Sequence, residues 1–412
     1  MSIFQSPRAR KTRIAVAVAL ATCTGTSAWA ADAAGKSFEI YGFIMLDGIQ
    51  DTKRVDPNWQ DAFRPSKIAT PEGQFGTNGQ SSISVKQSRL GVKGTMPTGD
   101  STPPINFKFE FDLFGVGADA GQTTIRFRHI YGEWGQILAG QTNSTFMDID
   151  IFPNVIDYWG PNGMVFFRVP QLRWTPLNTQ TDQFAVALEY ASNDVDPGNT
   201  RLIDEFQNST VRGTRTLPDL SAHYRMDQGW GHVQLAGILR QISYEYQPNP
   251  DTPFKRSSET GWGLDLTGHI NVGEKDKILL GVVHGNGIAT YMNDGGMDIA
   301  PNAAYDPLSP TPTLTAEAVP LTGITAYFDH YWNPTWSSSI GYSQVQVSNT
   351  NFQEPTVFHK AQYASANVLM YPAKNVMFGL EVLYGKRTSN DGTTGDDVRF
   401  QFSAKYDFGT KL

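Results

Sequence analysis

The chain has 412 residues and a formal net charge of −7 at pH 7, and 18% of its residues are charged. An acidic balance of this kind disfavours a nucleic-acid-binding protein. After the first 30 residues no apolar run approaches the roughly 20 residues of a membrane-spanning helix, so a helical membrane protein is excluded. The negative mean hydropathy fits either a soluble protein or a transmembrane β-barrel, whose lipid-facing and lumen-facing residues alternate.

The N-terminus has the pattern of a secretory signal peptide. Four basic residues between Arg8 and Arg13 precede an apolar run over 14–21, and Ala28-Trp29-Ala30 supplies small residues at the cleavage positions. We expect residues 1–30 to be removed, which leaves 31–412 as a single barrel domain. A lipoprotein signal at Cys23 is the alternative, although the Thr before this cysteine fits it poorly. Because Cys23 is the only cysteine, the domain is expected to form no disulfide.

Strands are predicted throughout the rest of the chain. The pattern is clearest over 105–113, where five apolar residues alternate with Asn106, Lys108, Glu110 and Asp112. We predict about sixteen strands: 37–47, 80–95, 105–113, three within 123–176, then 183–192, 217–226, 231–246, 261–272, 277–285, 321–332, 336–347, 357–371, 376–386 and 398–408.

The connections alternate between short turns and long polar loops such as 193–216 and 286–320. An outer-membrane barrel has this asymmetry, with short turns at one end and long loops at the other. A soluble sandwich or propeller does not need it. The last strand resembles the C-terminal assembly signal of outer-membrane barrels, except that four residues follow Phe408. We therefore predict an all-β fold, a transmembrane antiparallel β-barrel.

The stretch 123–176 carries arginines on two strands that flank a long loop. Arg126 and Arg128 stand two residues apart, so both lie on one face of their strand. Arg168 and Arg173 stand five apart, but the phase of the apolar residues changes at Pro170. This change predicts a β-bulge that returns both arginines to the polar face.

The loop between these strands carries Asp148, Asp150 and Asp157, and it is too rich in Asp, Pro, Asn and Gly for a helix or a strand. A loop that folds into a lumen opposite a row of cations narrows the pore and favours anions. The three carboxylates either oppose the arginines across the pore or cap local backbone, as Asp does at turns. The sequence therefore predicts an infolded constriction loop.

The residues of a metal, cofactor or catalytic site show no recognisable spacing. His129 follows Phe127 in phase, which predicts that it faces outward, and the other six histidines lack the spacing of metal ligands. Neither GxSxG nor HExxH occurs. We expect no cofactor, no metal and no enzymatic activity.

Several motifs together resemble the DcaP-like family of Gram-negative trimeric outer-membrane porins. They are GFIMLDGIQD near the start, DAFRPSK in the first long loop, QSRLGVKG, IRFRHIYGEWGQILAGQTNSTFMD, and GP followed by RVPQLRWTP. The resemblance is concentrated in residues 37–176. It implies a homotrimer of sixteen-stranded barrels in the outer membrane, each with its own pore for small organic anions such as dicarboxylates.

The resemblance also implies roles for particular residues. The constriction loop would be 144–163, after the fifth strand. The anion pathway would be lined by the arginines of the matching motifs, which are Arg89, Arg126, Arg128, Arg168 and Arg173. Arg64 and Lys67 of DAFRPSK are further candidates, although a loop cation can equally bind lipopolysaccharide phosphates or be solvated.

The leading hypothesis is an outer-membrane porin that passes small organic anions, dicarboxylates and aromatic acids, by diffusion through an arginine-lined constriction. Guanidinium groups suit this task because they pair with carboxylates through two parallel hydrogen bonds. Barrel interiors hold many charges in any case, so a general, non-specific porin is an alternative. Two further classes are an outer-membrane barrel enzyme with a nucleophile and base at its rim and a soluble secreted binding protein.

Overall fold

The computed structural model describes residues 35–99, 101–115, 124–197, 211–247, 251–303 and 313–411. The predicted signal peptide, residues 1–30, lies outside them. The described residues fall within one compact unit, Gly35–Leu412. Their helices are three short 3₁₀ turns, η1 (Pro65–Lys67), η2 (Ile149–Ile151) and η3 (Ala289–Tyr291). None of the helices in these ranges has the length and apolarity to cross a membrane.

Strands make up nearly all the regular structure. They are β1 (Ser37–Asp51), β2 (Gln80–Ser84), β3 (Arg89–Met96), β4 (Ile105–Gly115), β5 (Thr124–Trp134), β6 (Ile137–Asn143), β7 (Arg168–Asn178), β8 (Asp182–Glu189), β9 (Val211–Thr214), β10 (Asp219–Gln228), β11 (Gly231–Tyr246), β12 (Lys255–Val272), β13 (Asp276–Asn286), β14 (Ile299–Pro301), β15 (Ala316–Ala318), β16 (Pro320–Asn333), β17 (Trp336–Val347), β18 (Phe358–Ala373), β19 (Val376–Ser389) and β20 (Thr394–Lys411).

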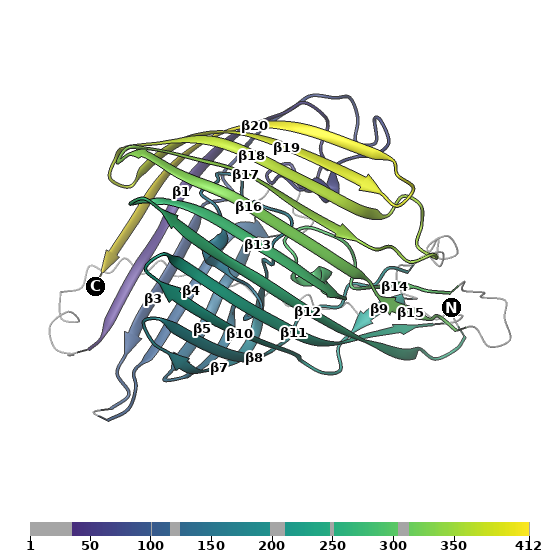
Figure 1. The fold of residues 1–412 in the computed structure, drawn as a ribbon, viewed down its shortest axis with the longest axis horizontal. Coiled ribbons are helices and arrows are strands. Elements are labelled where there is room, and N and C mark those ends of the chain that lie inside the picture. Colours follow the sequence, from purple (N-terminus) through teal and green to yellow (C-terminus); the bar gives the residue numbers. More distant parts are fainter. Residues whose placement is uncertain are drawn as a thin grey trace, which may run out of the picture. The chain divides into compact units, whose positions relative to one another are not determined.

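Eighteen of these strands form a closed antiparallel barrel, and β14 and β15 form a separate two-stranded sheet. The wall closes because β20 pairs with β1 along Glu39↔Lys411 to Asp51↔Arg399. In Figure 1, β1 (purple) and β20 (yellow) lie side by side, and the arrow of β20 points to the end of the barrel at which β1 begins. Both β2 and β3 pair with β1, and both β9 and β10 pair with β11, so each couple makes one stave. The eighteen-stranded sheet therefore has the sixteen staves that the sequence predicted.

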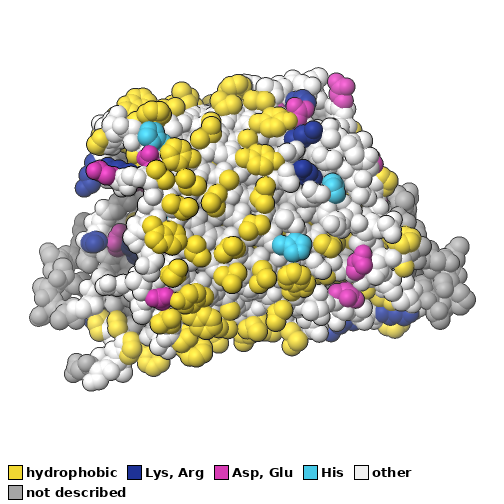
Figure 2. Space-filling view, viewed as in Figure 1, with side chains coloured by type: hydrophobic (Ala, Val, Ile, Leu, Met, Phe, Trp, Pro, Cys, Tyr) yellow, Lys and Arg dark blue, Asp and Glu magenta, His cyan; other side chains and the backbone are white. Residues whose placement is uncertain are grey.

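The two faces of the wall differ in polarity, as the alternation predicted. On β19, for example, Leu380 is 64% exposed on the outer face whereas Glu381 is 2% exposed on the inner face. Figure 2 shows hydrophobic side chains gathered on the outer wall, with charged side chains mainly toward its two ends. An apolar outer band of this kind is what a lipid-embedded barrel requires.

The connections also alternate as predicted. Short turns join β5 to β6, β16 to β17 and β18 to β19 at one end, whereas residues 52–79, 144–167 and 287–319 are long connections at the other. The β18–β19 turn contains Asn375 at a φ of 67°, a left-handed conformation that Asn tolerates better than most residues. In outer-membrane barrels the short turns face the periplasm and the long loops face outward.

The sequence misplaced one β-bulge. The β6–β7 ladder is continuous from Ile137↔Trp174 to Asn143↔Arg168, so the bulge predicted at Pro170 is wrong. With no extra residue between them, Arg168 and Arg173 have opposite phases on β7. Only Arg173 shares the phase of the buried Gln171.

The bulge lies instead on β5. The β4–β5 register steps from Glu110↔His129 to Phe111↔Phe127, which leaves Arg128 as the additional residue. This residue resets the alternation, so the outward position predicted for His129 is also wrong. The His129 side chain is 8% exposed, and its Nδ1 lies 2.9 Å from Thr142 Oγ1 on the inner face.

Candidate functional site

The loop 144–167 leaves the wall between β6 and β7 and crosses the lumen. It begins on the near wall, where Ser144 Oγ and Thr145 N donate to Glu189 of β8, each at 2.7 Å. It reaches β16, β17 and β18, which lie about half-way around the ring of strands. The predicted infolding of this loop is thereby confirmed.

Asp148 and Asp150 hold the first half of the loop to the wall. The Asp148 carboxylate lies 2.6 Å from His232 Nε2 and accepts from Thr267 Oγ1 at 2.8 Å, and it also caps η2 through Asp150 N. Asp150 pairs with Arg225 at 2.6 Å. These contacts are those of loop anchors. An opposing role across the pore stays a prediction for both carboxylates.

Carboxylates of the far wall hold the middle of the loop. Glu381 of β19 accepts from Ile156 N at 2.9 Å and from Asp157 N at 3.2 Å. Asp157 is buried, and it accepts from Phe63 N at 3.0 Å and from Tyr363 Oη at 3.2 Å. Burial raises the pKa of Asp157 above its ordinary value. This third predicted carboxylate therefore also fastens the loop, both to the wall and to the first long loop.

The loop then returns toward β4 and β5 through an aromatic contact. Tyr158 stacks on Phe114 with ring centroids 3.6 Å apart, and its hydroxyl donates to Asp112 at 2.7 Å. Arg128 Nη1 donates to the same hydroxyl at 3.2 Å. The loop thus contacts β4 and also β5, which carries Arg126 and Arg128.

A cluster of cations occupies this side of the lumen. Arg126 binds Asp112 through two hydrogen bonds of 3.1 and 2.7 Å, and Arg128 contacts both Glu110 and Asp112 at 2.9 Å. Arg89 and Lys108 lie 3.6 and 3.3 Å from Glu110. Four cations on β3, β4 and β5 therefore share two carboxylates, so the cluster carries net positive charge.

Arg168 adds a fifth cation beside this cluster. Its guanidinium lies 4.9 Å from the ring centroid of Phe166, and its Nε is buried with no hydrogen-bond partner. Within the described ranges it forms no ion pair with a carboxylate. Arg168 is the first residue of β7, directly after the constriction loop, and the end of this loop places it beside the same cavity as Arg126.

A cavity of about 570 Å³ lies between this cluster and the loop. Arg64, Arg126 and Arg168 line it together with the aromatic rings of Tyr158 and Trp159. Three of the predicted pathway residues thus lie around one water-accessible space. Arginine side chains beside aromatic faces suit a solute that has both a carboxylate and a flat apolar part.

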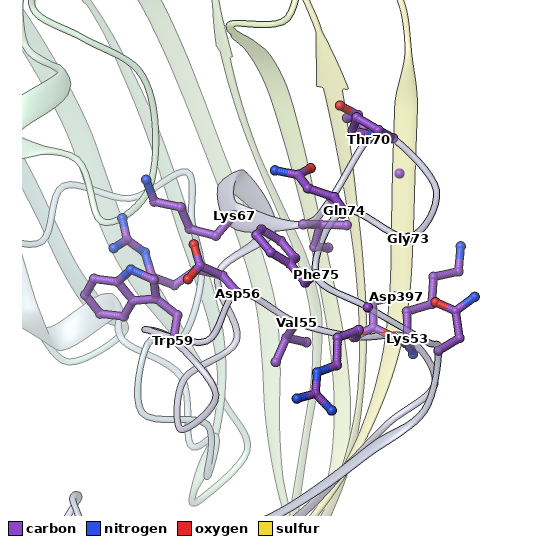
Figure 3. A pocket seen from close by; sticks show the side chains of 18 of the residues that line it. Lys53, Val55, Asp56, Trp59, Lys67, Thr70, Gly73, Gln74, Phe75 and Asp397 are labelled. Carbon is purple, nitrogen blue, oxygen red and sulfur yellow. Dashed lines mark hydrogen bonds between the residues drawn. The ribbon is translucent and has the colours of Figure 1, made fainter. Parts of the chain in front are cut away.

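Arg64 and Lys67 belong to the first long loop, residues 52–79, and Arg64 lines this cavity. Arg64 is held between Trp59 and Trp159, at 4.1 and 4.2 Å from their ring centroids, and it binds Asp294 through bonds of 3.1 and 3.0 Å. Figure 3 shows Lys67 extending from the first long loop toward the side on which Trp59 lies, beside a pocket of about 240 Å³ under that loop.

A third cavity, of about 380 Å³, brings these cations together with a residue that the sequence did not identify. Its lining includes Arg64, Lys67 and Arg387. It shares Arg64, Gly295 and Gly296 with the cavity of about 570 Å³. Arg387 donates to the carbonyl oxygens of Ile68 and Thr356, and its Nε has no partner among the described residues. The inward phase of Leu383 and Gly385 would have identified Arg387 had the strand been extended by one residue.

Arg173 lies apart from the other predicted arginines. It donates to Gln171 Oε1 at 2.9 Å and to the carbonyl oxygen of Asn143. None of these three cavities has Arg173 in its lining. Its role in the pathway therefore stays a prediction.

Comparison with solved structures shows the same fold. The outer membrane channel DcaP of Acinetobacter baumannii aligns with a TM-score of 0.72 and 23% identity over 92% of this chain and 99% of that chain. An anion-selective porin from Comamonas acidovorans gives 0.55 and 9% over 90% and 100%. The trimer form of OmpT from Vibrio cholerae gives 0.51 and 13% over 91% and 100%.

The family comparison covers most of the sequence. No curated protein matches the chain. The family described as DcaP outer membrane protein matches residues 41–408, a range that includes every strand from β2 to β19. The barrel, its apolar outer band and its infolded loop agree with this match. The chain belongs to the DcaP outer membrane protein family and is a porin of the Gram-negative outer membrane.

Proposed function

We propose that the pore passes small organic anions, dicarboxylates and aromatic acids among them, by diffusion through an arginine-lined constriction. The charge balance of the cation cluster carries this proposal. Among the residues that the structure describes, Arg89, Lys108, Arg126 and Arg128 form ion pairs only with Glu110 and Asp112. Arg168 adds a further positive charge beside them. Rings of cationic side chains are a usual basis of anion selectivity in pores.

The geometry of the arginines supports organic anions over simple halides. A guanidinium group offers a planar fork that matches a carboxylate, whereas a lysine ammonium acts as a point charge. Transport also requires weak binding at several successive sites. Arg64 and Arg126 already pair with Asp294 and Asp112, so a solute carboxylate must compete with these ion pairs and binds each arginine weakly.

We also propose that the protein is a homotrimer with one pore in each protomer. The motifs of residues 37–176 support this, as does the existence of a trimer form of OmpT, a porin of similar fold. Family membership likewise supports a channel rather than an enzyme.

A general, non-specific porin is the second candidate. It is favoured by the fact that Arg64, Arg126 and Arg128 each have a carboxylate partner within hydrogen-bond distance. A pore whose charges are largely paired discriminates weakly between ions.

Reversal potentials of the purified protein in planar bilayers under a salt gradient distinguish the two candidates. We expect wild type to prefer anions and the Arg126→Ala, Arg128→Ala double variant to have a lower ratio of anion to cation permeability, because the cluster around Glu110 and Asp112 then loses two of its positive charges. Transient blockade by added dicarboxylates and aromatic acids is expected in wild type alone. Equal reversal potentials in the two proteins would leave a general porin.

A further inference from the structure

The outer wall contains a shallow apolar groove of about 740 Å³ that the permeation pathway does not use. It runs over β1, β2, β18, β19 and β20. Its floor is made of small outward residues, Gly48, Ser81 and Ala366, and a Cβ added at Gly48 would meet no atom within 4 Å. Its sides are large exposed apolar residues, which include Ile83, Leu380 and Phe400. The groove therefore lies in the apolar band that faces lipid.

Two lysines lie on β18 and β19, closer than the groove residues to the end of the barrel that has the long loops. Lys386 follows Leu380, Val382 and Tyr384 in the outward phase of β19, and Lys360 has the outward phase of β18. Because Gln362 pairs with Lys386 and Lys360 pairs with Thr388, the two lysines are diagonal neighbours on adjacent strands.

Neither lysine is neutralised by a described carboxylate. Asp396 lies opposite Lys386 in the β19–β20 ladder, but its carboxylate pairs with Lys53 at 2.7 Å. Within the described ranges Lys360 and Lys386 form no ion pair. Two adjacent uncompensated ammonium groups attract an anion.

Along β19 toward the long loops, the apolar groove is followed by Tyr384 and then by Lys386, which is the order of acyl chain, membrane surface and headgroup in a lipid. Tyr384 is exposed between Val382 of the groove and Lys386, at the level where aromatic side chains line the membrane surface. Lys386 is four residues beyond Val382, roughly 13 Å along the strand. The lysines belong to the end of the barrel with the long loops, which faces outward. The anionic headgroups at this level are those of the outer leaflet.

We propose that this face binds the phosphorylated, acylated glycolipid of the outer leaflet, lipopolysaccharide, with an acyl chain in the groove and a phosphate group on Lys360 and Lys386. Each ammonium offers three hydrogen-bond donors to phosphate oxygens. An acyl chain gains apolar contact with the groove that a flat wall does not provide. A second copy of the chain is a less suitable occupant, because a protein contact would bury two unpaired lysines at a cost.

The test measures lipopolysaccharide bound to detergent-purified, delipidated protein by native mass spectrometry. For Lys360→Gln with Lys386→Gln we expect roughly thirty-fold weaker binding, which corresponds to about 1 kcal/mol for each lysine near an anionic lipid surface. Lys275→Gln with Lys374→Gln, in the turns at the opposite end of the barrel, is the matched control and should bind as wild type does. Ala366→Phe fills the groove without changing charge and should also weaken binding.

Two results would overturn the proposal. One is unchanged binding in both the lysine and the Ala366→Phe variants. The other is efficient disulfide cross-linking between copies of an Ala366→Cys variant in native outer membranes, since a second copy would then occupy the groove. The chain's only natural cysteine is Cys23, so the introduced thiol would be the only one in the barrel. Ion selectivity is recorded separately and is expected to stay the same in all these variants.

Discussion

Replacing Arg168 by Gln tests the anion pathway with the least disturbance of neighbouring charges. Arg126 and Arg128 hold Asp112 and Glu110, so removal of either leaves a carboxylate with one partner fewer. Arg168 contacts the ring of Phe166 and no described carboxylate. The variant therefore removes one positive charge from the wall of the 570 Å³ cavity and leaves the other pairs intact.

The expected magnitude follows from Coulomb's law. An anion that passes at about 5 Å from a unit charge gains about 0.8 kcal/mol where the dielectric constant is that of water. Screening at about 0.1 M salt, where the Debye length is about 10 Å, reduces this gain by roughly 40%. Because the same charge repels a cation by an equal amount, the ratio of anion to cation permeability should fall by roughly five- to fifteenfold, and the effect should shrink as salt is raised.

Reversal potentials across a bilayer measure this ratio directly. Arg168→Lys keeps the charge and should stay close to wild type with simple halides. Lys386→Gln removes a charge from the outer face of the wall and should also leave the ratio unchanged. A wild-type ratio for Arg168→Gln at low salt would show that Arg168 does not act on the permeating ion, and the charge argument for the whole cluster would then fail.

Three further variants test the constriction loop, the wall and the first long loop. Gly163→Ala would drive a Cβ into the carbonyl oxygens of Gln344 and Ile324 and push the constriction loop into the lumen, so single-channel conductance should fall. Gly132→Ala is the control, because its Cβ meets no atom within 4 Å, and it should conduct as wild type does. Arg399 is fully buried and binds Asp51 at 2.7 and 3.1 Å. Arg399→Met should lower the free energy of unfolding in urea by about 3–5 kcal/mol, because Asp51 loses its partner, and wild-type resistance to urea would contradict this. Loss of water around its ammonium and the nearby Arg64 charge lower the pKa of Lys67. Anion selectivity should therefore begin to fall at a pH below the value of about 10.4 typical of lysine, and Lys67→Arg should abolish this pH dependence.

The fold was predictable because one physical rule governs the whole wall. Each strand must present apolar residues to lipid and may present anything to the lumen, so alternation repeats from β1 to β20. The rule fails where the backbone departs from a regular ladder. The sequence placed a bulge at Pro170, since proline lacks an N–H donor, but Pro170 fits the β6–β7 ladder and the additional residue is Arg128. Local residue types do not reveal such a bulge, because it depends on the register between β4 and β5.

The site was predictable in its residue types and less so in its pairings. Glu110 and Asp112 were expected on the polar face of their strand, but their contacts with Arg126 and Arg128 depend on the relative register of β4 and β5. The anchoring of Asp157 by Phe63 and Tyr363 joins parts of the chain that are far apart in sequence. No periodicity within one strand contains this information.

The pairings explain how one loop can narrow a wide barrel and still leave a passage. The carboxylates of the loop do not face the arginines of the cation cluster. Asp148, Asp150 and Asp157 each bind groups outside the cavity that Arg168 lines. Had these aspartates faced the arginines, their mutual attraction would have closed the gap and cancelled the charge. Because they are anchored elsewhere, the cations of β3, β5 and β7 gain no further carboxylate partner from them, as the proposed anion pathway requires. In the proposed pathway, the position of the loop's carboxylates therefore matters for the charge beside the cavity as much as the arginines do.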